Sequence, residues 1–340
     1  MFDIQTLATA RTLVGPGKGI LAADESTGTI EKRFKSVGIA NTEANRRAYR
    51  EMLFTAPGLG EFISGIILFD ETIRQKAANG KPLVDILQQQ GIVPGIKVDH
   101  GAKALAGFPD EKMTEGLDGL RERLAEYREL GARFTKWRAV IAIASNIPTD
   151  PCLRSNAHGL ARFAALSQEA GLVPIVEPEV LMDGDHPLER HADVSQRMQR
   201  FVFDALAEHR VRLEAMLLKP NMVLSGADCR QQATVAEAAE ATLHCLMRTV
   251  PVAVPGIVFL SGGQSDVRAT EHLQAINQRG HAPWELSYSY GRALQTPALQ
   301  AWAGAPAKIA AGQKQLLHRA RCNSAARAGT YTAQMEAKGA

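Results

Sequence analysis

Lysines and carboxylates recur inside, or at the end of, apolar segments of this sequence. Because burying an unpaired charge is costly, a charge within an apolar segment indicates either an ion pair or a functional group. The cations are Lys97, Lys136, Arg138 and Lys219, and the carboxylates are Asp24, Asp99, Glu177 and Glu179. For one lysine taken alone, an ion pair within the fold explains the position equally well. For the whole set, convergence on one cavity is the better interpretation.

A lysine among apolar neighbours and beside a second cation has a lowered pKa, and its neutral amine can attack a carbonyl carbon. Leu217–Pro220 gives Lys219 apolar neighbours, and Lys136 could be the second cation. Nearby carboxylates can act as general acid and base while an imine forms and breaks. An imine is an electron sink, so the neighbouring carbon–carbon bond becomes easier to break. The spacing of Lys97, Lys136 and Lys219 leaves open which of them is the nucleophile.

Two loops rich in glycine and serine near the end of the chain could together bind a phosphate. Ser261–Ser265 follows the seventh apolar segment, and Ser289–Arg292 follows the eighth. Glycines expose backbone N–H groups, and serine and arginine add donors and charge. A single loop of this kind is more often only a turn. A further cluster, Ser26–Thr29 with Arg33 beyond it, could bind a second phosphate or cap a helix.

Eight apolar segments, each ended by glycine, proline or polar residues, predict β-strands. They cover residues 19–24, 62–70, 93–99, 134–140, 173–179, 215–220, 256–262 and 284–290. Amphipathic stretches between them, such as 117–130 and 235–250, predict helices. Eight strand–helix units favour an α/β fold with one (β/α)8 TIM barrel, in which the carboxyl ends of the strands meet on one face. Residues after 294 predict terminal helices, ending in a flexible tail from about 329 to 340.

The composition excludes several classes of protein. The 340 residues are 45% hydrophobic and 22% charged, which is typical of a globular chain. Lys and Arg outnumber Asp and Glu by 39 to 36, a balance that argues against a nucleic-acid partner. No segment has the pattern of a membrane helix or a signal peptide. Four scattered cysteines fit a reducing, cytoplasmic compartment, and no zinc-site spacing of His and Cys occurs, so we expect no metal.

Seven segments of the sequence, in order, resemble the class I, Schiff-base fructose-1,6-bisphosphate aldolases. They are residues 21–28, 95–99, 136–138, 173–179, 217–222, 259–265 and 289–294, of which 217–222 and 259–265 are the most specific. The resemblance runs from about residue 3 to about residue 331 and implies a single barrel domain over 1–340, usually assembled as a homotetramer. It also implies a lyase without cofactor or metal. Its reaction is the reversible cleavage of fructose 1,6-bisphosphate to dihydroxyacetone phosphate and glyceraldehyde 3-phosphate.

The same resemblance implies a role for each matching residue. Lys219 would form the Schiff base, and Glu177, with Glu179 close behind, would be the acid and base for carbinolamine formation and dehydration. Asp24 would take the proton from the hydroxyl beside the cleaved bond, while Lys136 would favour the neutral amine of Lys219 and stabilise charge on that hydroxyl. The ketone-side phosphate would be held by Ser261, Gly262, Gly291 and Arg292. The remaining substrate contacts would come from Ser26, Thr29, Arg33, Lys97, Arg138 and Ser289.

The sequence departs from the family pattern at a few positions. His100 stands where the family often has lysine, and Thr29 where it often has serine, and both keep a donor. Animal members end in a tyrosine on a flexible tail that reaches the active site, whereas Tyr331, the last tyrosine here, matches an internal position. The role of that tail in protonating the enamine and in preferring the bisphosphate is therefore open for this chain.

Two alternative functions stay open at this stage. A transaldolase-like or sugar-phosphate isomerising enzyme would also use a reactive lysine, although the second phosphate cluster at 26–33 favours a bisphosphate. A catalytically silent scaffold on the same fold would be indicated by loss of a catalytic residue. The four that matter, Asp24, Lys136, Glu177 and Lys219, are all present.

Overall fold

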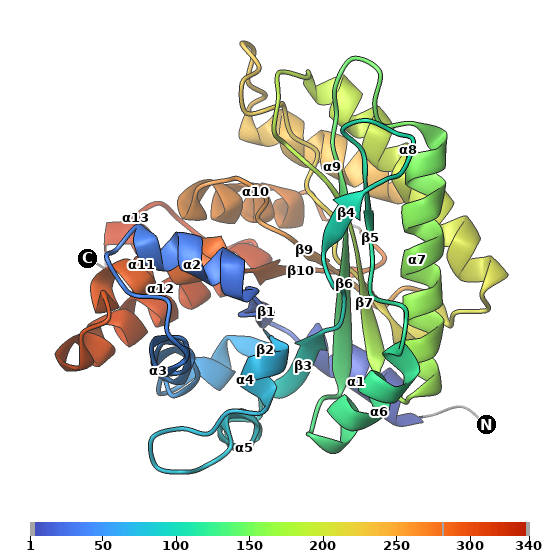
Figure 1. Ribbon diagram of the computed structural model, residues 1–340. Helices are drawn as coiled ribbons and strands as arrows, with labels where there is room; N and C mark the ends of the chain where they lie inside the picture. Colours follow the sequence, from blue (N-terminus) through green and yellow to red (C-terminus); the bar gives the residue numbers. More distant parts are fainter. Residues whose placement is uncertain (1–3, 281, 338–340) are drawn as a thin grey trace.

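Eight parallel strands close into a barrel in this computed structural model, which describes residues 4–280 and 282–337 (Figure 1). The order around the barrel is β1-β10-β9-β8-β7-β6-β3-β2. The strands are β1 Gly19–Ala22, β2 Ile63–Leu68, β3 Val93–Lys97, β6 Phe134–Ile141, β7 Val173–Val180, β8 Leu217–Leu218, β9 Gly256–Phe259 and β10 Glu285–Tyr290. Each overlaps the apolar segment that predicted it, so the predicted (β/α)8 barrel is confirmed.

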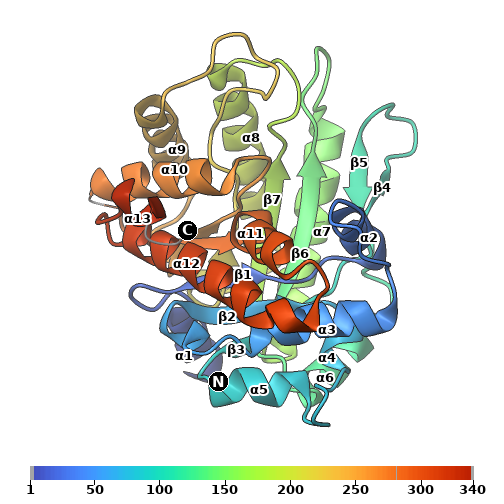
Figure 2. The same cartoon turned by 90° about the vertical axis from the view of Figure 1, so that its left-hand side faces the viewer.

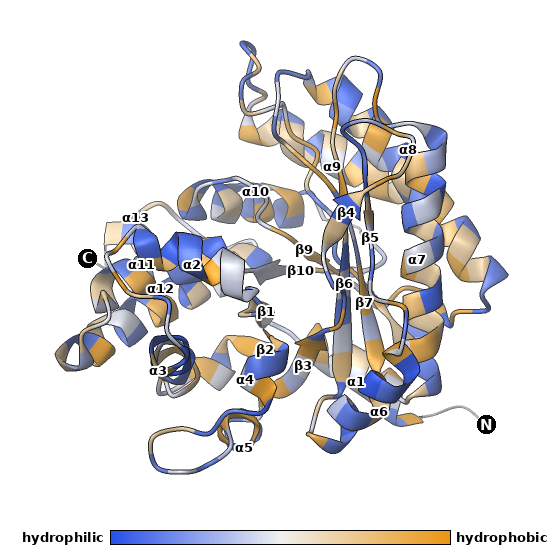
Figure 3. Ribbon diagram, viewed as in Figure 1, coloured by the Kyte–Doolittle hydropathy of each residue, from blue (hydrophilic) through white to orange (hydrophobic). Residues whose placement is uncertain are grey.

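Helices form the outer layer of the barrel and also extend it at both ends of the chain. They are α1 Ile4–Leu13, α2 Thr27–Lys35, α3 Glu43–Phe54, α4 Asp70–Ile73, α5 Leu83–Gln89, α6 Leu120–Glu129, α7 Asp150–Glu169, α8 Leu188–Glu208, α9 Val235–Thr249, α10 Asp266–Gln278, α11 Arg292–Trp302, α12 Ile309–Arg327 and α13 Gln334–Ala337, with short 3-10 turns η1 Leu59–Glu61, η2 Leu213–Ala215 and η3 Pro306–Lys308. Helix α7 runs along β6 and β7, and Figure 3 shows hydrophobic and hydrophilic patches alternating along it, as expected for a helix with one buried face.

Two separate apolar clusters lie on the two sides of the sheet. The larger fills the space between strands and helices and contains Trp137, Val176 and Leu218. The smaller lies inside the barrel at its amino end and includes Phe134 and Ile175. Because side chains alternate along a strand, neighbours such as Ile175 and Val176 join different clusters. The strands are therefore covered on both faces, which explains why they appear as nearly continuous apolar segments.

Helix α1 closes the amino end of the barrel. Its Leu13, with Val14 just after it, belongs to the inner cluster. Glycines give the large side chains room there, since a Cβ on Gly95 would lie 2.2 Å from the Phe134 ring. Helix α1 and the inner cluster form an apolar plug at this end of the barrel. The C-terminal part of the chain holds it in place, because Arg327 of α12 donates hydrogen bonds to the carbonyl oxygens of Val14 and Gly15.

A short antiparallel hairpin, β4 Ala102–Ala104 with β5 Lys112–Thr114, lies between β3 and α6 and was not predicted. Each of its strands has three residues, too few to give an alternating apolar pattern. The hairpin is joined to the barrel by the Thr114 hydroxyl, which donates to the Arg138 carbonyl at 2.7 Å. It therefore braces the carboxyl end of β6, where charged residues lie.

The C-terminal helices α11 and α12 pack against each other, and α12 also contacts β1 and β10, while α13 lies near α10 and α12 (Figure 2). This agrees with the terminal helices that the sequence predicts after residue 294. The single-domain division and the flexibility of residues 329–340 stay predictions, and residues 338–340 lie outside the described part of the chain. No helix within the described residues is long and apolar enough to cross a membrane.

Candidate active site

A cavity of about 400 Å³ opens at the carboxyl ends of the barrel strands. Every site residue predicted from the sequence lines it: Asp24, Ser26, Thr29, Arg33, Lys97, Lys136, Arg138, Glu177, Glu179, Lys219, Ser261, Gly262, Ser289, Gly291 and Arg292. The sequence did not single out four further lining residues, namely Ala22, Glu25, Lys32 and Leu260. The fold thus brings together residues separated by up to 268 positions.

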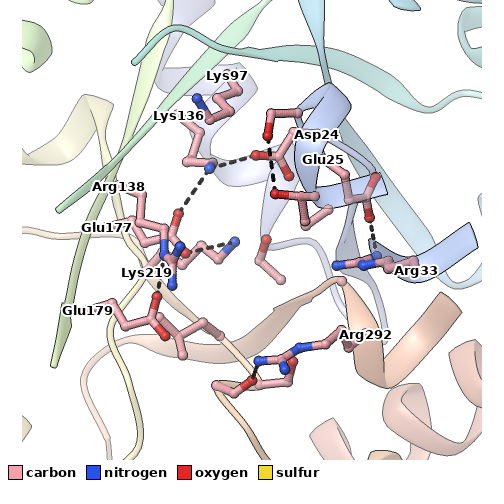
Figure 4. Close-up of a pocket in the computed structure, with 18 of the residues that line it drawn as sticks. Asp24, Glu25, Arg33, Lys97, Lys136, Arg138, Glu177, Glu179, Lys219 and Arg292 are labelled. Carbon is pink, nitrogen blue, oxygen red and sulfur yellow. Dashed lines mark hydrogen bonds and ion pairs between the residues drawn. The ribbon is translucent and has the colours of Figure 1, made fainter. Parts of the chain in front are cut away.

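Two lysines and two carboxylates form the centre of the cavity (Figure 4). Lys136 Nζ lies 2.6 Å from Asp24 Oδ2 and 3.4 Å from Glu177 Oε2. Lys219 Nζ lies 3.3 Å from the other oxygen of Glu177. The Lys219 side chain is only 4% exposed and that of Glu177 only 5%. Glu177 therefore bridges the Nζ atoms of the two lysines in a region that is largely shielded from water.

Mutual charge fixes the ionisation of Asp24 and Lys136. Burial alone would raise the pKa of Asp24, but the surrounding lysines, Lys136 first, hold it well below its ordinary value. Burial alone would lower the pKa of Lys136, but Asp24 and then Glu177 raise it well above the ordinary value. At neutral pH, Asp24 is therefore a carboxylate that can accept a proton, and Lys136 is a fixed positive charge.

Strand alternation places these side chains. Lys136 and Arg138 are two residues apart on β6, as are Glu177 and Glu179 on β7. In the parallel register Arg138 lies beside Glu177, and the backbone N–H of Lys219 donates to the Val176 carbonyl at 2.8 Å. Because every second side chain of a strand faces the same side, both side chains of each pair point into the cavity.

Asp99, one of the charged residues in the sequence pattern, does not line the cavity. Its buried carboxylate lies 2.6 Å from Lys97 Nζ and accepts hydrogen bonds from the backbone N–H groups of Gly101 and Arg138 at 3.0 and 3.2 Å. Asp99 therefore holds Lys97 in place at the cavity wall. A second pair, Arg138 with Glu179, lies next to Glu177 and Lys219 (Figure 4).

The loop after β9 and the loop after β10 meet at one side of the cavity. Gly262 has φ of +58°, in the left-handed region that favours glycine. The Arg292 guanidinium donates to the Gly262 carbonyl and so joins the two loops. The Ser289 hydroxyl is buried and has no hydrogen-bond partner among the described residues. These donors suit an anion such as a phosphate.

The β9 loop is held from below by residues that the sequence did not single out. Gln264 donates to the Ser261 carbonyl at 3.1 Å, and its amide oxygen lies 2.5 Å from Nδ1 of His272 on α10. Burial lowers the pKa of His272 to about 4, so its ring is neutral at pH 7. A neutral ring protonated at Nδ1 donates to the Gln264 oxygen and fixes which way that amide faces.

The cluster at the start of α2 lies close to these loops. Ser26 occupies the N-cap position, but its hydroxyl makes no capping bond and instead contacts the Thr29 hydroxyl at 3.1 Å. Burial is the largest cause that lowers the pKa of Arg292, and the positive charge of nearby Arg33 is the second largest. Two guanidinium groups held near each other favour binding of an anion between them, because the negative charge offsets the repulsion between the two positive charges.

Glu25, which the sequence also did not single out, holds Arg33 in place. Its buried carboxylate pairs with Arg33 and lies 3.2 Å from the buried Arg50 guanidinium. Gln295 donates to the same carboxylate at 2.7 Å and receives a hydrogen bond from Tyr49. No local motif marks this network, because its members come from the loop after β1, from α2, from α3 and from α11.

The closed barrel, the buried lysine pair and the anion-binding loops define an enzyme that acts on phosphorylated carbonyl compounds. A family model for class I fructose-bisphosphate aldolase matches residues 5–340. The chain is 56% identical over 331 residues to a probable class 1 fructose-bisphosphate aldolase of Xanthomonas campestris, covering 97% of this chain and 99% of the relative. It is 52% identical over 336 residues to the fructose-bisphosphate aldolase of Dictyostelium discoideum, covering 98% and 94%.

A solved structure gives the same result. The aldolase of Plasmodium falciparum, crystallised with TRAP and a small-molecule inhibitor, is 50% identical and superposes with a TM-score of 0.95 over 96% of this chain and 95% of that one. The chain therefore belongs to the class I fructose-bisphosphate aldolase family. It is a metal-independent lyase of glycolysis and gluconeogenesis that reversibly cleaves fructose 1,6-bisphosphate through a lysine Schiff base, as the sequence resemblance implied.

Proposed function

We propose that Lys219 is the lysine that forms the Schiff base with C2 of the substrate. The observation that carries this proposal is the pairing of the three cavity lysines. Lys97 is bound to Asp99, and Lys136 is a fixed cation bound to Asp24. Lys219 shares its only ion-pair carboxylate within the described residues, Glu177, with Lys136. Lys219 is thus the one of these three lysines that has no carboxylate of its own, and a lysine amine in such a cavity can attack a carbonyl.

Glu177 is the proposed acid and base of imine formation. The Lys219 amine adds to C2 to give a carbinolamine, and Glu177 donates the proton with which the C2 hydroxyl leaves as water. The Glu177 oxygen that lies 3.3 Å from Lys219 Nζ is close enough to serve the nitrogen and the departing hydroxyl in turn. Glu179, bound to Arg138, stands behind it.

Asp24 and Lys136 are the proposed residues of carbon–carbon cleavage. Asp24, ionised at neutral pH, takes the proton from the C4 hydroxyl as the C3–C4 bond breaks. The bond electrons pass into the imine and give an enamine, while C4 leaves as the aldehyde of glyceraldehyde 3-phosphate. Lys136, 2.6 Å from Asp24, stabilises the negative charge that develops on the C4 oxygen.

The phosphate groups would be bound at the rim of the cavity. We assign the ketone-side phosphate to the joined loops of Ser261, Gly262, Ser289, Gly291 and Arg292. The second phosphate would contact Ser26, Thr29 and Arg33, with Lys97 and Arg138 along the substrate between them. The presence of two donor clusters in the cavity wall, one at Ser26–Arg33 and one in the joined loops, supports a substrate with two anionic ends over one with a single phosphate.

Borohydride trapping tests the nucleophile. Reduction in the presence of dihydroxyacetone phosphate should leave a stable adduct on the peptide that carries Lys219, as located by mass spectrometry. An adduct on Lys97 or Lys136 would refute the assignment, and the lack of any lysine adduct would refute the imine route for this chain. Lys97→Met is the matched control, because it should trap at Lys219 with weaker substrate binding.

The cellular setting of the enzyme is also a proposal. We infer a cytoplasmic homotetramer. Relatives include a cytosolic aldolase of Arabidopsis thaliana and a chloroplastic one of Oryza sativa, so the family name alone does not fix the compartment. Exposed apolar side chains at the end of α9 and just after it, Met247 and Val252 at 57% and 74% exposed, support an interface between copies of the chain. Light scattering should give the mass of four 36.7 kDa chains.

A further inference from the structure

A cluster of three metal-binding side chains lies outside the catalytic cavity, at the C-terminal end of the described chain. We infer that His318, Cys322 and Glu336 bind a soft divalent transition-metal cation such as Zn²⁺, which fastens α13 to α12. One ligand atom from each of the three residues lies within 4.8 Å of the others. This is the one such group found among residues 4–280 and 282–337. None of the three residues lines the catalytic cavity.

The two helices bring the ligands together in a simple way. His318 and Cys322 are four residues apart on α12 and so lie on one face of that helix. The chain then turns after α12 at Gly329, with φ of +71°, and returns so that Glu336 of α13 faces them. The backbone N–H of Tyr331 donates to Gln274 of α10 at 3.1 Å and fixes this return.

The distances between the ligand atoms fit a tetrahedral ion. His318 Nε2 lies 3.4 Å from Glu336 Oε2 and 3.8 Å from Cys322 Sγ. Zinc bonds of about 2.0 Å to nitrogen and oxygen, and about 2.3 Å to sulfur, place neighbouring ligand atoms about 3.3–3.6 Å apart. Two of the three separations therefore lie within a few tenths of an ångström of the zinc values. The Cys322 and Glu336 ligand atoms, which lie within 4.8 Å of each other, would move closer on binding, and water can take the fourth position.

The chemistry of the donors favours zinc over calcium or magnesium, because thiolate and imidazole are softer ligands than oxygen. Cys322 is buried, and the His318 and Glu336 side chains are only 12% and 24% exposed. A bound cation would displace the thiol proton of Cys322, and the resulting thiolate and the Glu336 carboxylate would neutralise its two positive charges.

Arg319 is the competitor for this site. Its guanidinium pairs with the same oxygen of Glu336 that would face the metal. It also donates to the Asp266 carbonyl at 3.1 Å and to the Thr270 hydroxyl at 2.6 Å, so it keeps partners on α10 when Glu336 turns to the ion. The Tyr331 hydroxyl donates to the other Glu336 oxygen at 2.8 Å and orients the carboxylate as an outer-sphere partner.

The consequence of binding concerns the end of the chain and leaves the reaction metal-independent. Helix α13 has four residues, and none of them is buried. Side-chain attachment of α13 comes from the polar contacts of Glu336 and from partly buried Met335, which packs against the larger apolar cluster. A metal that joins Glu336 to two α12 ligands would take the place of Arg319 on this carboxylate and would fasten α13 to α12 together with the Tyr331 contact.

Cobalt titration of the full-length, untagged protein tests the site, after chelator treatment and dialysis. Co²⁺ bound to the cluster should give a thiolate-to-cobalt charge-transfer band and strong visible bands of a tetrahedral ion, saturating at one ion per chain. Added Zn²⁺ should abolish these bands. Absence of a charge-transfer band at saturating Co²⁺ would overturn the proposal.

Four variants locate the ion. Cys322→Ala and His318→Ala should abolish the charge-transfer band, and Glu336→Gln should weaken binding at least several-fold. Cys229→Ala is the matched control, since Cys229 is a free thiol elsewhere in the fold, and it should bind Co²⁺ as the parent does. Retention of the band in Cys322→Ala, or its loss in Cys229→Ala, would place the ion elsewhere and refute the site. Aldolase activity of each variant serves as the check of folding.

Proteolysis tests the fastening of α13. Zn²⁺ should slow trypsin or chymotrypsin cleavage within residues 327–337 of the parent several-fold and leave the rate in Cys322→Ala unchanged. Equal protection of both proteins, or none in the parent, would refute the claim that the ion fastens this helix.

Discussion

The two ends of the barrel are built from the same strands and have opposite character. At the amino end, the strand interiors and α1 form an apolar plug. Two residues further along the same strands, the interior becomes a charged cavity. The pairs of apolar and charged residues are Phe134 and Lys136, Ile175 and Glu177, and Leu217 and Lys219.

This contrast shows how one strand can serve stability and chemistry at once. Residues two apart on a strand face the same side, so the apolar residue lies directly below the charged one. The plug contributes burial of apolar surface, while the ion pairs above it add little net stability because their charges lose hydration. We therefore expect substitutions at the two ends to separate activity from stability.

Lys219→Met should give the largest effect, a loss of kcat/KM on the order of 10⁴- to 10⁶-fold, because the nucleophile is removed. The melting temperature should change by only a few degrees, since Glu177 keeps Lys136 as its partner. Steady-state kinetics and thermal unfolding check both statements, with the exposed Lys308→Met as control. A kcat/KM of Lys219→Met above a hundredth of the parent's would contradict the assignment of the chemistry to the charged end of the barrel.

Leu13→Ala should have the opposite signature. Leu13 is fully buried in the plug, so its truncation should lower the free energy of unfolding by about 2–5 kcal/mol. Below the melting temperature, kcat/KM should stay within about two-fold of the parent, because no cavity residue is touched. Denaturant titration and kinetics at low temperature measure the two quantities. A large fall in kcat/KM with unchanged stability would contradict the separation of roles.

Asp24→Asn should show that the cavity end makes stability depend on pH. The folded-state pKa of Asp24 is held below its usual value, so its ion pair stabilises the fold above about pH 4 and is lost as the pH falls further. The parent should therefore be more stable than Asp24→Asn at pH 7, by about 2 kcal/mol, and the difference should shrink toward pH 3. The free energy of unfolding of Leu13→Ala should change with pH in the same way as that of the parent. A constant gap between Asp24→Asn and the parent would refute this linkage.

His272→Leu should give the smallest effect, because it acts on the phosphate loop through Gln264. Loss of one buried hydrogen bond predicts about a ten-fold rise in KM with a smaller change in kcat. His272→Asn keeps a donor near the position of Nδ1 and should restore most of the affinity. A fall in kcat at constant KM, or equal defects in both variants, would argue against a positioning role.

Much of the barrel could be predicted from the sequence because its signals are local. Apolar segments with glycine or proline at their ends marked all eight strands. The seven motifs marked the predicted residues that line the cavity, except Thr29 and Arg33, which follow the first motif. The hairpin of 102–104 with 112–114 escaped prediction because strands of three residues show no periodicity.

The support behind the cavity could not be predicted. Glu25 joins Arg33, Arg50 and Gln295, and these residues are spread over 271 positions of the chain. Asp99 looked like a member of the cavity and instead holds Lys97 from behind. Such contacts depend on how helices pack on the barrel, for which a single sequence gives no local signal.

The sequence by itself determined which residue types stand at each strand end, and therefore the chemistry available to the protein. Only the tertiary structure decided how they are paired, with Lys136 on Asp24 and Lys219 on Glu177. It also brought His318 and Cys322 to Glu336, fourteen residues beyond Cys322. The physical reason is that ion pairs and metal–ligand bonds form only between atoms a few ångströms apart. Closure of the barrel and packing of its last helices therefore decide which residues pair.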